Sequence, residues 1–265
     1  MSEAVPEETL LVWRSLLYVP ANNQRFIDKA HTRGADAIIL DLEDSVPAAE
    51  RDRARSMLAE SAAISSQTGS DVVVRINRPD VEGISDLDAT VIAGVDALML
   101  PKVDDAAHVL ALADAVEKLE SERGLTPGGI RFVVMVESPA ALFKADEIAS
   151  AHPRNTAAFL GGEDFATTAG MVPDPETLFL PKLMTMFAAR AAGITPLGML
   201  GTVADYQDLD AVRGIIKRSR KFGFEGASCI HPSVVPLLNE EMAPSMAEVD
   251  QAQRIVEAYA AAEKE

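Results

Sequence analysis

Two acidic side chains follow consecutive apolar runs of this chain. Glu137 ends the run VVMVE, and Asp164 follows the run AAFLGGE 27 positions later. Runs of this length are typical of buried strands, and consecutive strands of a parallel sheet are neighbours, so we expect the two carboxylates to lie close together. Their mutual repulsion can be relieved by a shared proton or by a divalent cation. We favour the cation.

The residue types around this pair favour magnesium over zinc. Mg²⁺ binds one or two carboxylates, keeps several waters and leaves its other positions to substrate oxygens. Zinc prefers His and Cys, and His31, His108 and His152 fall in helical or loop segments without ligand spacing. We therefore predict Mg²⁺ at Glu137 and Asp164.

Arg75, in the run VVVRIN, is the candidate anion receptor. A guanidinium stays charged at all working pH values and can grip a carboxylate or an enolate oxygen with two parallel hydrogen bonds. The run before it ends in LDLED, which supplies Asp41, Glu43 and Asp44. An ion pair between Arg75 and these acids is the structural alternative, and both roles can hold together.

Other polar residues at the ends of runs have less specific readings. Lys102 ends LMLPK, and His231 in CIHP is interpreted as a structural histidine because no partner is visible in the sequence. Arg14 begins the first run instead of ending it, so its position does not follow from this pattern. Cys229 is the single cysteine, which excludes an intramolecular disulfide and fits a reducing compartment.

These residues need a scaffold that gathers the ends of many strands. Eight short apolar runs alternate with helical patterns, which predicts a (β/α)₈ TIM barrel, whose chemistry lies at the carboxyl ends of its strands. A doubly wound open sheet is the alternative, although no glycine-rich phosphate loop follows the first run. The runs are SLLYVP, AIILD, VVVRIN, DALMLPK, RFVVMVE, AAFLGGED, TPLGML and GASCIHP.

The composition is that of one acidic globular domain. Its 265 residues suit a single barrel, with residues 1–12 as an N-terminal arm and 246–265 as a terminal helix. The net charge of −17 argues against nucleic acids and anionic membranes as partners. The sequence has neither a signal peptide nor a membrane-spanning apolar stretch, so we expect a cytoplasmic protein.

Eight motifs together resemble the citrate lyase β-subunit-like group of the HpcH/HpaI aldolase and malyl-CoA lyase superfamily. The resemblance covers nearly the whole chain, and DLEDSV with RIN and CIHP is its strongest part. The motifs are RSLLYVPANNQRFIDKA, DAIILDLEDSV, VVVRIN, LMLPKV, VVMVES, FLGGEDF, LGMLGTVADYQDLDAVR and RSRKFGFEGASCIHPSVV.

This resemblance implies a Mg²⁺-dependent lyase that cleaves or forms a carbon–carbon bond through an enolate, in a citryl-, malyl- or citramalyl-like 3-hydroxyacyl thioester. It also implies coenzyme A or an acyl-carrier protein as partner and assembly as a homotrimer or hexamer. Its expected site residues are Glu137 and Asp164 for the metal, Arg75, Glu43 and Asp44 for catalysis, and Arg14, Arg75 and Lys102 for the substrate.

The sequence departs from this family at its end. Many relatives continue into a C-terminal lid that carries a catalytic aspartate and closes over a neighbouring subunit, whereas this sequence stops at Glu265. We therefore expect a barrel lacking the lid. Two alternatives follow: an aldolase acting on a free 2-keto acid of the pyruvate or oxaloacetate type, and a non-catalytic subunit that binds an acyl-carrier protein or coenzyme A.

Overall fold

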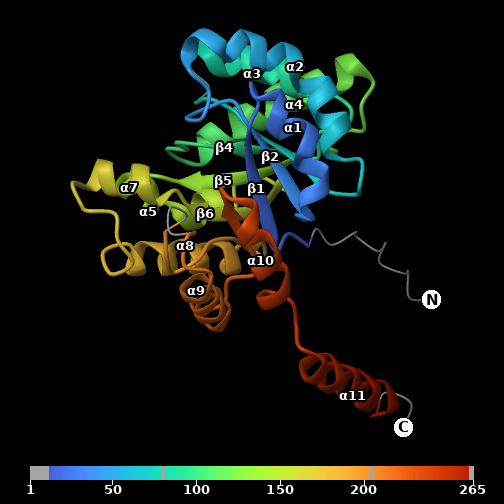
Figure 1. Cartoon of the computed structure of the whole chain (residues 1–265), viewed down its shortest axis with the longest axis vertical. Helices are drawn as coiled ribbons and strands as arrows, with labels where there is room; N and C mark the ends of the chain where they lie inside the picture. Colours follow the sequence, from blue (N-terminus) through green and yellow to red (C-terminus); the bar gives the residue numbers. More distant parts are fainter. Residues whose placement is uncertain (1–11, 79–80, 203–205, 263–265) are drawn as a thin grey trace.

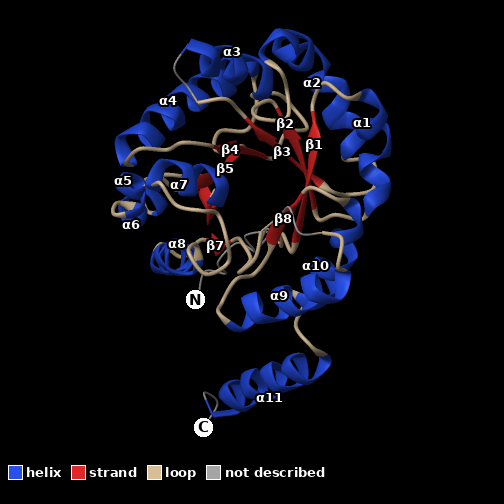
Figure 2. Ribbon diagram, turned by 60° about the vertical axis from the view of Figure 1, so that its left-hand side comes forward, coloured by secondary structure: helices blue, strands red, loops and turns tan. Residues whose placement is uncertain are grey.

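The computed structural model describes residues 12–78, 81–202 and 206–262, without the side chains of 81–85. Its centre is a parallel sheet of eight strands in the order β7-β6-β5-β4-β3-β2-β1-β8. An isolated parallel bridge between Leu197 and Gly226 links the two outer strands, so the sheet curls into a TIM-barrel-like ring (Figure 2). The strands are β1 (Ser15–Pro20), β2 (Ala37–Asp41), β3 (Asp71–Arg75), β4 (Ala97–Leu100), β5 (Arg131–Val136), β6 (Asn155–Leu160), β7 (Thr195–Pro196) and β8 (Ala227–Cys229).

Each strand lies at one of the predicted runs, and β7 differs most from its run because it is only two residues long. Pro196 has no amide hydrogen to donate to a ladder. Gly198 follows with a φ of 138°, a conformation that L side chains rarely adopt. The chain therefore leaves the sheet early and forms an irregular segment that lines the mouth of the barrel.

Helices surround this ring, with α1 and α2 near β1 and β2, and α8 near β7 (Figure 2). Asp105 caps α4 by accepting the His108 amide, and Gly124 ends that helix at a φ of 65°. The helices of the ring are α1 (Gln24–Ala30), α2 (Arg51–Ser65), α3 (Val81–Thr90), α4 (Ala106–Arg123), α5 (Pro139–Leu142), α6 (Ala145–Ala149), α7 (Gly162–Ala169), α8 (Phe179–Ala191), α9 (Leu209–Lys221) and α10 (Val235–Glu241). No helix within the described ranges combines the length and the apolar character that a bilayer crossing needs.

Two apolar clusters divide the core. The larger lies between the sheet and the helices and includes Leu40, Val72 and Val74. The smaller fills the inside of the ring and includes Ile39 and Val73. Because side chains alternate along a strand, the residues two positions beyond this inner pair also face the interior, at the carboxyl-terminal end.

The last helix, α11 (Met246–Ala262), projects away from the ring (Figure 1). Nearly all its residues are exposed, and an ion pair of 2.9 Å between Arg220 and Glu248 ties it to α9. The predicted terminal segment is thus helical over these residues, while 263–265 and residues 1–11 of the predicted arm lie outside the described chain. The expected absence of a lid stays a prediction.

Candidate active site

Arg75 and Asp41 form a bidentate pair at the carboxyl end of the ring. They are the last residues of β3 and β2 and are partners in the parallel register. Arg75 donates from Nε to Asp41 Oδ1 at 2.6 Å and from a terminal nitrogen to Oδ2 at 2.7 Å. Both side chains face inwards, two residues after Val73 and Ile39. The arginine is therefore held rigidly with its charge directed at the mouth of the barrel.

Three acids surround this arginine, and we call Asp41, Glu43 and Asp44 the acidic cluster. A terminal nitrogen of Arg75 lies 2.9 Å from Glu43 Oε2 and 3.1 Å from Asp44 Oδ2. Lys102 Nζ donates to Glu43 Oε1 at 2.6 Å. Burial acts to raise the pKa of Asp41, but the hydrogen bonds and charge of Arg75 outweigh it and lower that pKa. Burial dominates at Glu43, whose pKa is raised despite both cations.

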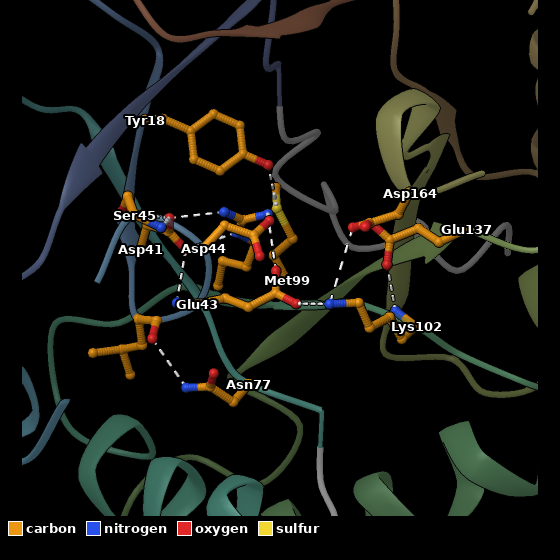
Figure 3. A network of polar contacts seen from close by, with 12 residues as sticks. Tyr18, Asp41, Glu43, Asp44, Ser45, Asn77, Met99, Lys102, Glu137 and Asp164 are labelled. Atoms are coloured by element: carbon orange, nitrogen blue, oxygen red, sulfur yellow. Dashed lines mark hydrogen bonds and ion pairs between the residues drawn. The ribbon is translucent and has the colours of Figure 1, made fainter. Parts of the chain in front are cut away.

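Glu137 and Asp164, the acid pair, lie together beside Lys102 (Figure 3). Glu137 follows β5 and is buried, and its Oε2 accepts the Lys102 backbone amide at 2.6 Å. Lys102 Nζ lies 4.0 Å from Asp164 Oδ2. Burial raises the pKa of Glu137 to about 8, because the Lys102 amide only partly offsets it and the charges of Glu43 and Asp164 raise it further.

The backbone of Lys102 takes an unusual conformation to make this contact. Its φ is 52°, and no other non-glycine residue within the described ranges has a positive φ. A lysine in this left-handed region costs of order 1 kcal/mol or more, and such costs concentrate at functional sites. The conformation points the Lys102 amide at Glu137 while the side chain reaches Glu43.

Gly161 leaves the space that Glu137 occupies. It follows β6, and a Cβ built on it would stand 2.3 Å from Glu137 Oε1 and 2.6 Å from its Cγ. Any larger residue would displace the buried carboxylate. The first glycine of the motif LGGED is therefore explained by close approach and not by a turn.

The acid pair fits a hard divalent cation. Two carboxylates, one of them buried and carrying a strongly raised pKa, gain most from a nearby positive charge. Gly161 supplies the room, and an open cavity supplies places for water and substrate oxygens. The donors of the pair are carboxylate oxygens, which suit Mg²⁺ better than Zn²⁺, because zinc prefers His and Cys. Over the described part of the chain, no group of three or more His, Cys, Asp or Glu is arranged to hold a metal.

A cavity of about 390 Å³ opens beside these residues. This volume is within the range of small-molecule sites. The charged side chains that line it are Asp41, Asp44, Arg75, Glu137, Glu163, Asp164 and Lys182.

Comparison with known proteins identifies the family of this chain. Residues 14–232 match the family described as HpcH/HpaI aldolase/citrate lyase. The chain belongs to this family. It is 34% identical to the citrate lyase subunit beta of Escherichia coli over 258 residues, which cover 95% of this chain and 84% of that protein. It is a citrate lyase β-like member.

Two further relatives bear on the chemistry. A (3S)-malyl-CoA thioesterase of Cereibacter sphaeroides is 34% identical over 255 residues, covering 95% of this chain and 85% of that one. A crystal structure of the protein CitE from Mycobacterium tuberculosis, in complex with magnesium, acetoacetate and coenzyme A, has a TM-score of 0.71 and 27% identity, covering 93% of this chain and 87% of that one.

In this citrate lyase β-like chain the predicted site residues fall into two groups. The structure brings together Arg75, the predicted acids and Lys102, but it places Arg14 elsewhere. Arg14 precedes β1 at the amino end of the ring, where Nε and a terminal nitrogen donate to Asp36 at 2.9 and 2.8 Å. It does not line the cavity. The expected substrate contact of Arg14 is therefore corrected, because a residue that begins a strand lies at the opposite end from the site.

Among the residues that line the cavity, sequence reasoning missed Tyr18 and Lys182 as members of the site. Tyr18 lies in β1, and the guanidinium of Arg75 sits 5.0 Å from its ring centroid. Lys182 lies in α8, in the apolar stretch FLPKLM, where a single lysine was the available signal.

His231 caps a short 3₁₀ turn by accepting the Ser233 amide, and its ring stacks on Tyr206 at a centroid distance of 4.7 Å, which agrees with a structural interpretation.

Proposed function

We propose that this protein is a magnesium-dependent carbon–carbon lyase of the citrate lyase β type, acting on a citryl-, malyl- or citramalyl-like 3-hydroxyacyl thioester. The observation that carries the proposal is the buried carboxylate of Glu137 beside Asp164, in the same cavity as Arg75. Family membership and the magnesium, keto acid and coenzyme A named for the Mycobacterium tuberculosis relative support it.

Cleavage of such a thioester moves charge in a defined direction. The hydroxyl loses its proton, its oxygen becomes the carbonyl of a 2-oxo acid, and the electrons of the broken bond pass to the thioester as an enolate, which is then protonated. Glu137 and Asp164 would hold Mg²⁺, whose charge, when the ion is bound, stabilises the negative charge that develops.

Arg75 is the cation that this chain itself supplies. Because Asp41 holds it by two hydrogen bonds, its charge is oriented before the substrate arrives, and a fixed partner of this kind is worth about 3 kcal/mol of barrier. Glu43 orients Lys102 by accepting one hydrogen bond from its Nζ. In the proposal these acids position the two cations.

The proton acceptor must also line the cavity. Asp44 and Glu163 are exposed carboxylates on its wall that do not belong to the acid pair. They are our candidates for taking the hydroxyl proton. Asp44→Asn and Glu163→Gln distinguish them, since the variant that loses the base should lose kcat with little change in KM.

Thioester hydrolysis is the second candidate, because the Cereibacter sphaeroides relative named as a thioesterase matches this chain at the same 34% identity as the citrate lyase subunit. The two reactions give different products from one substrate. A lyase converts a malyl thioester into glyoxylate and an acetyl thioester, whereas a hydrolase releases malate and a free thiol.

The deciding experiment incubates the purified protein with citryl, malyl and citramalyl thioesters of coenzyme A, with Mg²⁺ or with a chelator, and measures 2-oxo acid and free thiol separately. Oxaloacetate and pyruvate as free substrates test the aldolase alternative. We expect 2-oxo acid formation that the chelator and Glu137→Gln abolish. Full turnover in that variant would refute the proposal, and no turnover on any substrate, together with capture of an acyl-carrier protein, would favour a non-catalytic subunit.

We also propose assembly into a homotrimer or hexamer. The exposed apolar side chains of Ile255, Val256 and Tyr259 on α11 support it, because apolar side chains gathered on one exposed helix face favour contact with another chain. Light scattering on the full chain, compared with one ending before Met246, measures the effect of α11 on assembly.

A further inference from the structure

Lys182 stands on the wall of the cavity and is held there by backbone carbonyls. It lies near the start of α8, and its Nζ donates to the carbonyls of Met199, at 2.9 Å, and Gly201. These two residues belong to the irregular segment after β7. Lys182 and Met199 line the same cavity as Arg75 and Glu137.

Lys182 has no carboxylate in direct contact among the described residues, unlike the other cations near the cavity. Arg75 and Lys102 each contact carboxylate oxygens within about 3 Å. For Lys182, no carboxylate oxygen lies within ion-pair distance among the residues that the structure describes. Its hydrogen bonds go to neutral carbonyls, and an ammonium with three N–H groups keeps one for another acceptor.

Burial makes this ammonium receptive to an anion. Desolvation lowers the pKa of Lys182 to about 8, and the charge of Glu163 opposes that shift only in part. A largely buried cation without a contacting counter-ion is stabilised by an anionic ligand that reaches it. Glu163 is exposed on α7, so it does not fill this place.

We infer that Lys182 is the receptor for a second carboxylate of the substrate, on the 2-oxo acid fragment, so that the site selects dicarboxylic over monocarboxylic fragments. The inference rests on the proposed function. The proposal places the reacting end of the fragment at the acid pair and Arg75, and it assigns the second carboxylate to Lys182 because Lys182 lines the same cavity. A citryl-type thioester, which yields oxaloacetate, carries this extra group, whereas malyl and citramalyl thioesters do not.

Binding measurements on matched acids test this without requiring turnover. Oxaloacetate and pyruvate share the 2-oxo acid end and differ by one carboxylate. With Mg²⁺ present, calorimetry should show that Lys182→Met weakens oxaloacetate binding by at least about tenfold, the effect of losing a hydrogen bond to a charged group. Pyruvate binding should change by less than about twofold, because the variant leaves the reacting end intact.

Three controls separate the outcomes. Lys182→Arg keeps the charge and should retain part of the preference for oxaloacetate. Lys144→Met removes a lysine that pairs with Asp105 away from the cavity, and it should leave both affinities unchanged. Coenzyme A without an acyl group tests whether Lys182 instead serves a phosphate of the carrier.

Equal weakening of both acids in Lys182→Met and Lys182→Arg would overturn the inference and leave Lys182 as a support for the segment after β7. A loss confined to coenzyme A would also overturn it. Failure of the lyase proposal would appear differently, as no thioester cleavage together with an intact difference between the two acids. Should Lys182→Met fail to fold, Lys182→Gln, which keeps hydrogen-bond donors for the two carbonyls, replaces it.

Discussion

Each end of the barrel contains an arginine that makes two hydrogen bonds to one aspartate. That aspartate lies on the neighbouring strand or directly before it. At the amino end, Arg14 donates to both oxygens of Asp36, just before β1 and β2. At the carboxyl end, Arg75 donates to both oxygens of Asp41, on β3 and β2. The two pairs have the same chemistry and similar N···O distances. Hydrogen-bond geometry alone therefore does not distinguish a structural arginine from a functional one.

Their surroundings do. Arg14 contacts the carboxylate of Asp36 and a backbone carbonyl of Asn239, so its charge is balanced, and it does not line the cavity. Arg75 belongs to a group in which carboxylates outnumber cations, and this group opens into the cavity. Excess negative charge beside an open space attracts a cation and, through it, an anionic substrate. The net charge of the surrounding group and its access to the cavity distinguish the functional end of the barrel better than the arginine–aspartate pairs do.

The largest expected effect comes from removing a charge of the acid pair. Glu137→Gln keeps the shape of the side chain but weakens metal binding, so kcat/KM should fall by about a thousandfold, equivalent to several kcal/mol of charge stabilisation. The matched change at the amino end, Asp36→Asn, should leave kcat/KM within about twofold while lowering the unfolding temperature. Steady-state kinetics at a fixed Mg²⁺ concentration that saturates the wild type measures kcat/KM in both variants, and thermal melts measure the unfolding temperature. Equal losses at the two ends would remove this distinction between them.

Changing the arginines should separate stability from activity. Lysine cannot reproduce a bidentate grip, so Arg75→Lys and Arg14→Lys should both lower the unfolding temperature. Arg75→Lys should also reduce kcat by about a hundredfold, because an oriented charge beside the reacting atoms is lost. Arg14→Lys should not change kcat. The comparison fails if the two variants lose activity to the same degree.

Substitutions at two separate glycines, Gly161 and Gly214, test whether the site needs open space beside Glu137. Gly161→Ala places a methyl group 2.3 Å from Glu137 Oε1 and should reduce kcat/KM by roughly tenfold or more, since small displacements of a catalytic group are costly. Gly214 lies in α9, and a methyl group added to it would meet no atom within 4 Å. Gly214→Ala should therefore keep full activity and raise stability by about 0.5–1 kcal/mol. Thermal melts and kinetics on both variants test this.

The smallest expected effect is on stability as a function of pH. The pKa of Glu137 is raised to about 8, so between its ordinary value of 4.5 and about 8 the folded state holds a proton that the unfolded state has lost. The stabilisation from this proton is complete below pH 4.5 and is lost as the pH rises through 8. In metal-free protein, the unfolding temperature of the wild type should fall by a few degrees more than that of Glu137→Gln between about pH 6 and about pH 9. Excess Mg²⁺ should remove the difference, and parallel melting curves without metal would contradict the assignment.

The alternation of apolar runs and helical patterns was enough to predict eight strands and a barrel-like arrangement, because parallel strands buried on both faces read as continuous apolar runs. The same pattern located Glu137, Asp164 and Arg75 at strand ends. It could not resolve the length of β7, where Pro196 and Gly198 end the sheet early. It also did not show that Lys182, the single lysine of the apolar stretch FLPKLM, faces the cavity.

By itself, the sequence determined which residues stand at the ends of strands, since that depends on local order along the chain. Only the tertiary structure decided which of them face one another. Arg14 binds Asp36 and does not line the cavity. Lys102 adopts a φ of 52° and donates its amide to Glu137. The physical reason is that charge balance, burial and open space arise between elements, where contacts join residues far apart in the chain.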